Sequence, residues 1–510
     1  MESAAFPVPG PVVTGSVLSS VKSTAASGVR WFEARLERRW VWATAIAAAA
    51  MLQLALIFTH RPWLDEYQAL LIAIEPSRVG ETLAQLHYEG HPPLWYLLLR
   101  ALHSIAPAAW VLTIASIICA GIIQTALLAF APFPRVERLM LALGEIFLFE
   151  YGTIARGLAL GAALVLLAMS VWRTRVVWLV IALLPLCEFL FGVFSAALVV
   201  LLWRERRLSA WGVGLWLACS TAAALSVIPA ADASPALGLY PFGVEVSDFM
   251  ERVGTLVLPL QTFKDRLLWD GMAPLLSGVL LGPLMLVWVF KRTRHSHVQC
   301  KLFFAFFALC FAMSVFVYSL HFRYVSVLAL LLIAFAWIQP RSGPDRWWRP
   351  WLAVSAFSGL VTSALALSTP FDASPDVAAV ILKLDDGHPW LAYPASRIPA
   401  LHALTGKRFI QPEQGCSHGF VRWNHRSPIH TWAQYRQALA EWARLYGRSF
   451  IVLEFMPRDV PASVFRPLTG RLQGYDGQVY IVGILAPHEP TVTRAYPHCA
   501  SIARGISVSR

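Results

Sequence analysis

Long apolar segments alternate with short polar segments along most of the chain, from residue 42 to residue 368. The apolar segments cover 42–60, 109–131, 137–151, 157–172, 176–203, 211–230, 272–290, 302–320, 324–339 and 351–368. A membrane-spanning helix needs about 20 predominantly apolar residues, and many of these segments come close to that length. The composition agrees, since 57% of the 510 residues are hydrophobic and only 14% are charged. The pattern predicts a polytopic α-helical membrane protein.

Basic clusters between the apolar segments predict the orientation of the chain, because cytoplasmic loops carry an excess of Lys and Arg. The clusters lie at 30–39, 135–138, 173–175, 204–207, 291–301 and 341–349. All of them face the cytoplasm if 92–106 is a juxtamembrane helix at the outer interface and 176–203 crosses twice, with a break at 185–188. This arrangement predicts about 11 transmembrane helices, with a cytoplasmic amino terminus and an extracytoplasmic carboxyl-terminal region.

The composition changes twice along the chain and so divides it into three parts. Residues 1–40 are predicted to be a disordered cytoplasmic segment that ends in an interfacial helix. Residues 41–369 form the transmembrane domain, whose first outer loop covers 61–108. Residues 370–510 predict a small extracytoplasmic α/β domain. Its expected helices are 376–384 and 431–446, and its expected strands are 389–393, 449–455 and 478–485.

The formal net charge of +12 does not indicate binding to nucleic acid, because the basic residues are spread between the spans and not gathered on one face. Their positions indicate topology control and contact with membrane lipids. Most of them are arginine, which favours a bacterial source and hence the inner membrane.

Two of the seven cysteines, Cys416 and Cys499, lie in the polar carboxyl-terminal region. If that region is outside the cytoplasm, the two can form a disulfide. The sequence alone fits the paired and the free state equally well.

The first outer loop carries the adjacent carboxylates Asp65 and Glu66 a few residues after the first span. Partial desolvation at the membrane surface raises the pKa of a carboxyl group, which suits it to general-base catalysis. The alternative is a solvated pair that caps a helix. We take Asp65 and Glu66 as the catalytic candidates.

Glu89 and His91 follow in the same loop, and His91 precedes two prolines, which hold its backbone in an extended conformation. A histidine fixed near carboxylates can bind a phosphate or an acceptor hydroxyl. An ordinary interfacial histidine is the alternative. A divalent cation held by Asp65, Glu89 and His91 is also conceivable, although no ligand spacing requires it.

Two arginines are expected on the outer face, against the positive-inside trend. Arg156 ends the sequence YGTIAR, which begins at Tyr151, and Arg323 lies in HFRY between His321 and Tyr324. A guanidinium offers paired donors to phosphate and keeps its charge, so these residues are candidate substrate-binding groups. Snorkelling to lipid headgroups is the alternative.

Three carboxylates, Glu145, Glu150 and Glu188, lie within or at the ends of apolar segments. Intramembrane carboxylates usually face a polar interior. They can pair with Arg156 or line a cavity, but they also suit a proton relay in a transporter.

The order of these motifs resembles the GT-C superfamily of membrane glycosyltransferases. The residues that carry the resemblance are LDEYQALL, HPPLWYLLL and YGTIARGLAL, and it extends loosely to HFRYVSVLALLLIAFAW. The branch that looks most similar contains protein O-mannosyltransferases and lipid A aminoarabinose transferases. The resemblance implies a GT-C-like fold and a polyprenyl-phosphate-linked sugar donor, with transfer on the outer face to a hydroxyl of a lipid, glycan or protein.

By position, the resemblance implies that Asp65 is the base that deprotonates the acceptor, that Glu66 supports it, and that Arg156 and Arg323 hold the leaving lipid phosphate. Metal-dependent relatives carry an acidic residue after the third-span turn, where this chain has Gly157. No cofactor is therefore expected, with a divalent cation as the alternative. A single in-line displacement predicts inversion at the anomeric carbon.

Other functions also fit the sequence. A transporter or flippase of lipid-linked glycans would need charged residues deep in the spans, and a membrane assembly or sensor protein would leave Asp65 and Glu66 dispensable. A transferase of a non-sugar lipid group is a further alternative.

Overall fold

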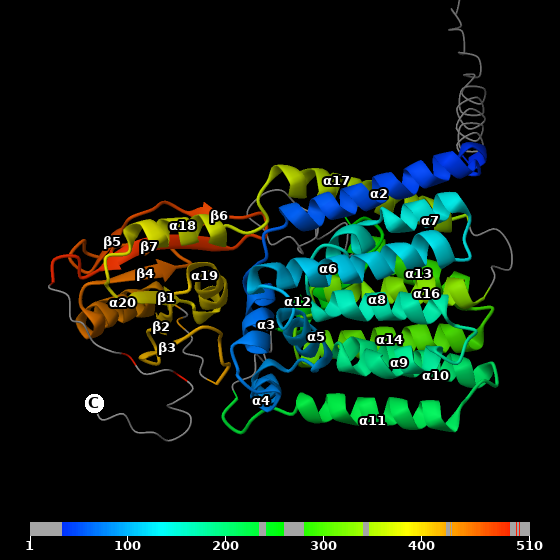
Figure 1. Cartoon of the computed structure of the whole chain (residues 1–510), viewed down its shortest axis with the longest axis horizontal. Coiled ribbons are helices and arrows are strands. Elements are labelled where there is room, and N and C mark those ends of the chain that lie inside the picture. Colours follow the sequence, from blue (N-terminus) through cyan, green and yellow to red (C-terminus); the bar gives the residue numbers. More distant parts are fainter. Residues whose placement is uncertain are drawn as a thin grey trace, which may run out of the picture.

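The computed structural model consists of a helical part followed by a smaller domain built around a β-sheet (Figure 1). It describes residues 33–233, 241–259, 280–339, 346–424, 429, 431–489, 496 and 499. The helical part runs to Ser368, and the sheet domain begins with α18 (Ser374–Leu384). Residues 1–32, which make up most of the expected cytoplasmic segment 1–40, lie outside the described residues, as do residues 272–279 of the expected span 272–290.

Among the described residues, four helices are long and apolar enough to cross a membrane. They are α2 (Arg39–Thr59), α6 with its π-helical extension (Ala108–Phe130), α14 (His297–Phe316) and α17 (Trp348–Ser368). Shorter apolar helices lie among them: α8 (Gly157–Ser170), α9 with η3 (Val177–Leu186), α10 (Phe189–Arg204), α11 (Ala210–Ser226), and α15 with α16 (Phe322–Ile338). The helical fold is confirmed, whereas the expected number of about 11 spans is not.

The apolar segment 176–203 is interrupted where the sequence predicts it. Helix α9 (Val177–Leu183) and the short turn η3 (Leu184–Leu186) end before Glu188, whose backbone is extended, and α10 begins at Phe189. The two helices therefore meet at a break that exposes backbone and side-chain groups of Glu188 to the neighbouring loop.

The segment 137–151, expected as one span, is divided into α7 (Arg135–Ala142) and the π-helical turn η2 (Ile146–Glu150). The division lies at Gly144, where the chain approaches α17 closely. A Cβ atom added to Gly144 would lie 2.9 Å from Ser355 Oγ, so a larger residue would need the Ser355 side chain to shift. The segment is thus divided at a glycine that lies in close contact with α17.

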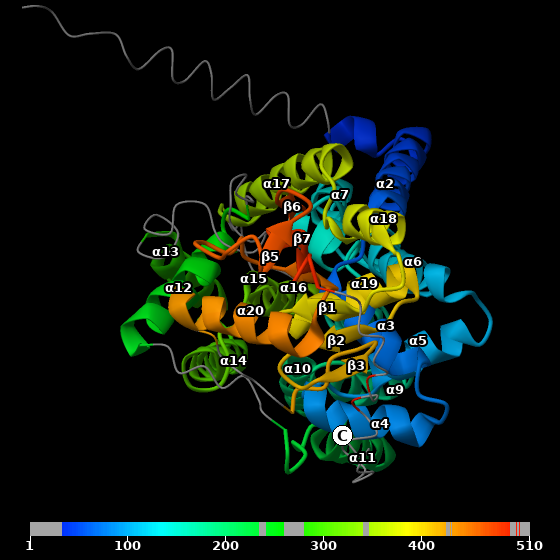
Figure 2. The same cartoon turned by 90° about the vertical axis from the view of Figure 1, so that its left-hand side faces the viewer.

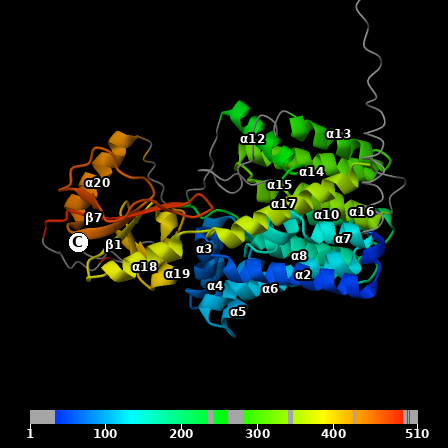
Figure 3. The ribbon, with the colours of Figure 1, turned by 90° about the horizontal axis from the view of Figure 1, so that it is seen from above.

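The segment 61–108, expected as the first outer loop, contains three short helices, α3 (Leu64–Ile74), α4 (Val79–Glu89) and α5 (Leu94–His103). Helix α5 has 10 residues, too few to cross a bilayer, which agrees with the interfacial helix expected at 92–106. Figures 1 and 3 show α3 and α4 between the helical part and the sheet domain. The loop is thus positioned to contact both parts.

The carboxyl-terminal domain is a mixed sheet in the order β3-β2-β1-β4-β7-β5, with β6 paired to β7. Strands β1, β2 and β4 are parallel, and the remaining pairs are antiparallel. The strands are β1 (Trp390–Tyr393), β2 (Phe409–Gln411), β3 (Cys416–His418), β4 (Ser449–Leu453), β5 (Phe465–Pro467), β6 (Leu472–Gln473) and β7 (Val479–Leu485). The three expected strands correspond to β1, β4 and β7, while the short strands β2, β3, β5 and β6 were not expected.

Helices cover both faces of this sheet (Figure 2). Because side chains alternate along a strand, Trp390 and Phe450 pack with α18 and α19 (Ile398–Thr405), while Leu391 and Ile451 pack with α20 (Trp432–Tyr446). The two expected helices correspond to α18 and α20, and α19 is additional. Cys416 of β3 and Cys499 form a disulfide, which resolves the two states that the sequence left open.

Candidate functional site

Asp65 and Glu66 are adjacent in the first turn of α3, but they have different surroundings. Successive residues of an α-helix are about 100° apart around its axis, so neighbouring side chains point apart. The Glu66 side chain is 0% exposed, whereas the Asp65 side chain is 29% exposed. The two carboxylates therefore serve separate purposes.

Glu66 connects three segments that lie far apart in the sequence. Its Oε2 accepts a hydrogen bond from the backbone N–H of Trp63 at 3.1 Å and lies 2.8 Å from His60 Nε2. Its Oε1 accepts from the backbone N–H of Ala155 at 2.7 Å. Glu66 thus fixes the start of α3 against the turn that carries Arg156, and it acts on Asp65 as a positioning residue.

We expect Glu66→Gln to lower the free energy of unfolding by about 2–3 kcal/mol, because an amide accepts hydrogen bonds at one end only. Its NH₂ group would face the N–H of Trp63 or of Ala155. The matched control is Glu81→Gln, since Glu81 accepts from Ser77 and Arg78 at the start of α4, and it should cost less than about 1 kcal/mol. Thermal unfolding of the two purified variants measures both changes in stability. Equal losses of stability in Glu66→Gln and Glu81→Gln would contradict the conclusion that Glu66 fixes α3 against the turn that carries Arg156.

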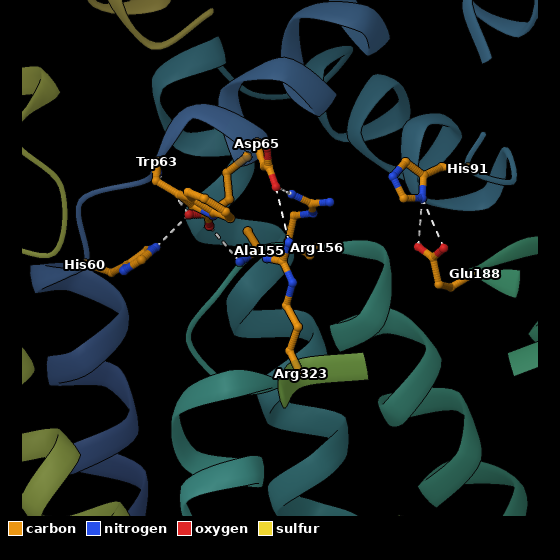
Figure 4. A network of polar contacts seen from close by, with 9 residues as sticks. His60, Trp63, Asp65, His91, Ala155, Arg156, Glu188 and Arg323 are labelled. Carbon is orange, nitrogen blue, oxygen red and sulfur yellow. Dashed lines mark hydrogen bonds and ion pairs between the residues drawn. The ribbon is translucent and has the colours of Figure 1, made fainter. Parts of the chain in front are cut away.

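Two guanidinium groups converge on Asp65 (Figure 4). Arg156 Nη1 forms an ion pair with Asp65 Oδ2, and Arg323 Nη2 donates to the same oxygen at 3.2 Å. Burial alone would raise the pKa of Asp65, but the two arginines outweigh burial and hold the pKa below its usual value. Without a substrate, Asp65 is therefore a charged but weakly basic carboxylate.

The two arginines reach Asp65 from different elements. Arg156 immediately precedes α8, and Arg323 belongs to the short helix α15 (Phe322–Val325). The Arg323 guanidinium lies over the rings of Trp63 and Tyr324, 5.1 and 5.3 Å from their centroids. These aromatic contacts hold its planar group in place while leaving its edge directed at the carboxylate.

Tyr151 supports this arrangement from within the protein. Its side chain is buried, its hydroxyl lies 2.6 Å from Ser326 Oγ, and it donates to the carbonyl oxygen of Arg323 at 3.1 Å. Both contacts fix the α15 backbone. In this structure Tyr151 therefore positions Arg323, and its predicted contact with substrate stays a prediction.

His91 and Glu188 form a second polar pair beside the first (Figure 4). His91 Nδ1 lies 3.0 and 3.1 Å from the two carboxylate oxygens of Glu188. Burial lowers the pKa of His91, but Glu188 outweighs this effect and raises it above the usual value. Glu188, which the sequence leaves free to pair with Arg156 or to line a cavity, thus has His91 as its hydrogen-bond partner.

Glu89 is held by Gln68, a residue that sequence reasoning missed. Gln68 Nε2 donates to Glu89 Oε1 at 2.7 Å and to the carbonyl oxygen of Val421 at 2.8 Å, and its Oε1 accepts from Val421 N at 2.9 Å. Burial raises the pKa of Glu89 to about 7, although His91 and the Gln68 hydrogen bond lower it. Because Asp65 and Arg156 also interact electrostatically with Glu89, its charge affects the main site.

His321 is adjacent to the site but is not part of the Asp65 contacts. Burial, together with the charges of Arg323 and Arg252, lowers the pKa of His321 to about 3, so its imidazole is neutral at physiological pH. Its ring packs edge to face against the ring of Tyr318. The rings of His321 and Tyr324 both pack against Tyr318, with centroids 6.1 and 6.4 Å away, and the predicted contact of the two residues with substrate stays a prediction.

No group of three or more His, Cys, Asp or Glu residues with metal-ligand geometry occurs among the described residues. Asp65, Glu89 and His91, the alternative ligand set, each have a different protein partner. The expectation that the protein needs no divalent cation stays a prediction.

No family model and no curated protein matches the chain. Among the solved structures that are similar to it are two crystal structures of ArnT from Cupriavidus metallidurans. The structure bound to undecaprenyl phosphate has 13% sequence identity and a TM-score of 0.40, covering 88% of this chain and 98% of that chain. The apo structure has 13% identity and a TM-score of 0.41, covering 87% and 97%.

A likeness this distant assigns no activity and no residue role to the chain.

Proposed function

We propose that this protein is a polyprenyl-phosphate-dependent glycosyltransferase of a bacterial inner membrane, which transfers a sugar to an acceptor hydroxyl on the outer face. The observation that carries the proposal is the convergence of Arg156 and Arg323 on Asp65. Paired guanidiniums suit a phosphate, and a carboxylate between them suits a proton acceptor. The site requires all three groups in one place.

The site also lies where a lipid-linked donor can reach it. Arg156 and Arg323 each stand at the end of an apolar helical segment, α8 and α15–α16, while Asp65 belongs to the loop helices that follow α2. A donor whose prenyl chain stays among the spans would therefore present its phosphate at the level of the arginines. A soluble nucleotide donor would gain nothing from this placement.

The reaction balances without any further reactant. Asp65 accepts the proton of the acceptor hydroxyl as that oxygen bonds to the anomeric carbon, and the bond from this carbon to the phosphate oxygen breaks. The bonding electrons leave with the polyprenyl phosphate, whose increased negative charge Arg156 and Arg323 stabilise. Attack opposite the leaving group inverts the anomeric configuration.

Donor binding itself would make Asp65 a better base. In the free protein both arginines bind Asp65 and lower its pKa. A phosphate competes for the same N–H groups and brings negative charge beside the carboxylate, which raises the pKa of Asp65. Asp65 would therefore become strongly basic only once the donor occupies the site.

The charge of Glu89 predicts a pH dependence of donor binding. Since the pKa of Glu89 is about 7, it becomes negative above that pH and repels an anionic donor. His91, whose pKa is raised by Glu188, loses its positive charge in the same direction. We expect the KM for the donor to rise roughly fivefold between about pH 6 and about pH 8.

The variant Glu89→Gln separates the contribution of Glu89 to this pH dependence from that of His91. Its side chain cannot ionise, and it can still accept the hydrogen bond from Gln68. Its donor KM should rise less steeply over the same pH range, and steady-state rates at several donor concentrations measure this. If the donor KM of Glu89→Gln depended on pH as the wild-type KM does, ionisation of Glu89 would not be the cause of the pH dependence.

The experiment that tests the function compares cell-envelope glycans and glycolipids by mass spectrometry. The samples are cells with wild-type protein, with Asp65→Asn and without the protein, after expression and membrane insertion have been verified. A hexose- or pentose-sized addition present only with the wild type supports a transferase and identifies the sugar class. A lipid-linked glycan that changes its side of the membrane without any new mass would instead indicate a flippase.

The same product formation, measured in membranes, tests the metal expectation. We expect an excess of EDTA to leave the initial rate unchanged within about twofold, because charge stabilisation is assigned to the two arginines. Loss of activity with EDTA and recovery with Mg²⁺ or Mn²⁺ would show that a cation is needed.

A further inference from the structure

A cavity of about 760 Å³ lies at the end of the helical part that is remote from the candidate active site. It is bordered by α13 (Gly282–Thr293) and by parts of α14, α16 and α17. Helix α17 begins at Trp348 beside the cavity and runs for 21 residues toward the sheet domain, which corresponds to about 30 Å. Helix α16 likewise starts beside Arg323 and ends at Ile338 near the cavity. The basic clusters place this end in the cytoplasm.

The inner wall of the cavity is apolar and aromatic. Leu332 and Phe335 of α16 line it, as do Trp288 of α13 and Trp351 of α17, whose rings pack 5.4 Å apart. Trp351 Nε1 donates to the carbonyl oxygen of Leu256 at 2.8 Å, so its polar group is satisfied and its ring is available for apolar contact. A wall of this kind suits hydrocarbon chains.

The edge of the same cavity is basic. Lys291 and Arg292 at the end of α13 and Arg346 before α17 all line it, and Lys291 and Arg346 are exposed. The guanidinium of Arg292 lies 4.4 Å from the ring centroid of Trp348, and that of Arg346 lies 5.5 Å from the ring centroid of Trp347. The three cations are thus grouped at the edge of the cavity.

A buried amide provides a second, independent observation. Gln299 of α14 lines the cavity, is only 7% exposed, and its Nε2 has no hydrogen-bond partner among the described residues. An unsatisfied buried donor costs free energy, and a ligand that accepts its hydrogen bond removes this cost. The cavity therefore suits a molecule with a hydrogen-bond acceptor at the boundary between its charged and apolar parts.

We propose that this cavity binds an anionic phospholipid of the cytoplasmic leaflet. The phosphate lies among Lys291, Arg292 and Arg346, an ester oxygen accepts from Gln299 Nε2, and an acyl chain lies along the aromatic wall. Basic pockets between transmembrane helices on the cytoplasmic side are suited to such headgroups. The proposal does not depend on the transferase activity, because the two sites lie at opposite ends of α16 and α17.

The test is native mass spectrometry of the purified, delipidated full-length protein, titrated with phosphatidylglycerol. Lys291→Gln combined with Arg346→Gln removes two rim cations. The matched control, Arg294→Gln with Lys301→Gln, removes two exposed cations of the same cytoplasmic surface that do not line the cavity. We expect the rim variant to raise the Kd about thirtyfold, or about fivefold per cation, and the control to change it less than about threefold.

Gln299→Leu tests the amide separately. We expect it to weaken phosphatidylglycerol binding about tenfold, and to raise the Tm of the lipid-free protein, because it removes an unsatisfied buried donor. A variant with unchanged affinity would overturn the role of Gln299, and unchanged affinity in the rim variant as well would overturn the site.

Competing lipids distinguish the source of the phosphate. Phosphatidylcholine at equal concentration should displace little phosphatidylglycerol, and inorganic phosphate should displace none. Equal binding of phosphatidylcholine, equal loss in the rim and control variants, or preferential binding of a polyprenyl phosphate would each overturn the proposal. The last outcome would assign the cavity to the donor lipid.

Discussion

Asp65→Asn is expected to lower the rate of sugar transfer by about 10²–10⁴-fold, because the amide cannot accept the proton of the acceptor hydroxyl. The change keeps the shape of the side chain and its hydrogen-bonding oxygen. It removes the negative charge that the two arginines surround. The initial rate of product formation in membranes, normalised to the amount of inserted protein, measures the loss.

Loss of charge beside two guanidiniums also affects folding, so the rate is compared with that of Asp65→Glu. This variant keeps a base and an ion pair and should retain more activity than Asp65→Asn. Asp376→Asn is the matched control, because Asp376 is an exposed carboxylate bound to Arg61 at 2.8 Å. Full activity of Asp65→Asn together with an inactive Glu89→Gln would assign the base to Glu89.

Arg323→Gln should lower kcat by about 10²–10³-fold, the usual loss when one fixed donor to a developing negative charge is removed. The donor KM should rise as well, since the donor carries phosphate in its ground state. Arg323→Lys should recover part of the activity, because an ammonium keeps the charge but offers no planar pair of donors. Steady-state rates at varied donor concentration measure kcat and KM separately.

The matched control for Arg323→Gln is Arg61→Gln, since Arg61 lies just before α3 and binds Asp376. It should change kcat less than about threefold. An equal decrease of kcat in Arg61→Gln and Arg323→Gln would mean that the general loss of a positive charge, and not the position of Arg323, explains the effect.

Much of the fold was predictable because the signals are local. A change from apolar spans to alternating strands around residue 370 is visible in composition, and Pro185 with Glu188 marks the break between α9 and α10. The short strands at 409–411 and 416–418 are different, since three residues carry too little periodicity to be recognised. The interruption at Gly144 has only a weak local sign, the glycine itself, because a single glycine is often tolerated within a helix.

The candidate site was predictable only as separate residues. Asp65 stands out as one of two adjacent carboxylates after the first apolar segment, and Arg156 and Arg323 stand out as arginines expected outside, against the positive-inside trend. Their convergence on one oxygen is a property of tertiary packing. Nothing in the sequence distinguishes Gln68 from other glutamines on apolar helices, or shows that Glu66 binds Ala155 N across 89 residues.

The bridge made by Gln68 has a consequence for the order in which the protein is made. Gln68 and Val421 are separated by 353 residues, and both groups of the Val421 backbone bind the Gln68 amide. A ribosome completes every apolar helix of the helical part before it reaches Val421, and Cys499, which pairs with Cys416, comes later still. The partner that fixes Gln68 against Glu89 is thus absent until synthesis is nearly complete. A growing chain would contain both arginines and Asp65 before Val421 exists, so the candidate site would be completed only once the last domain has folded.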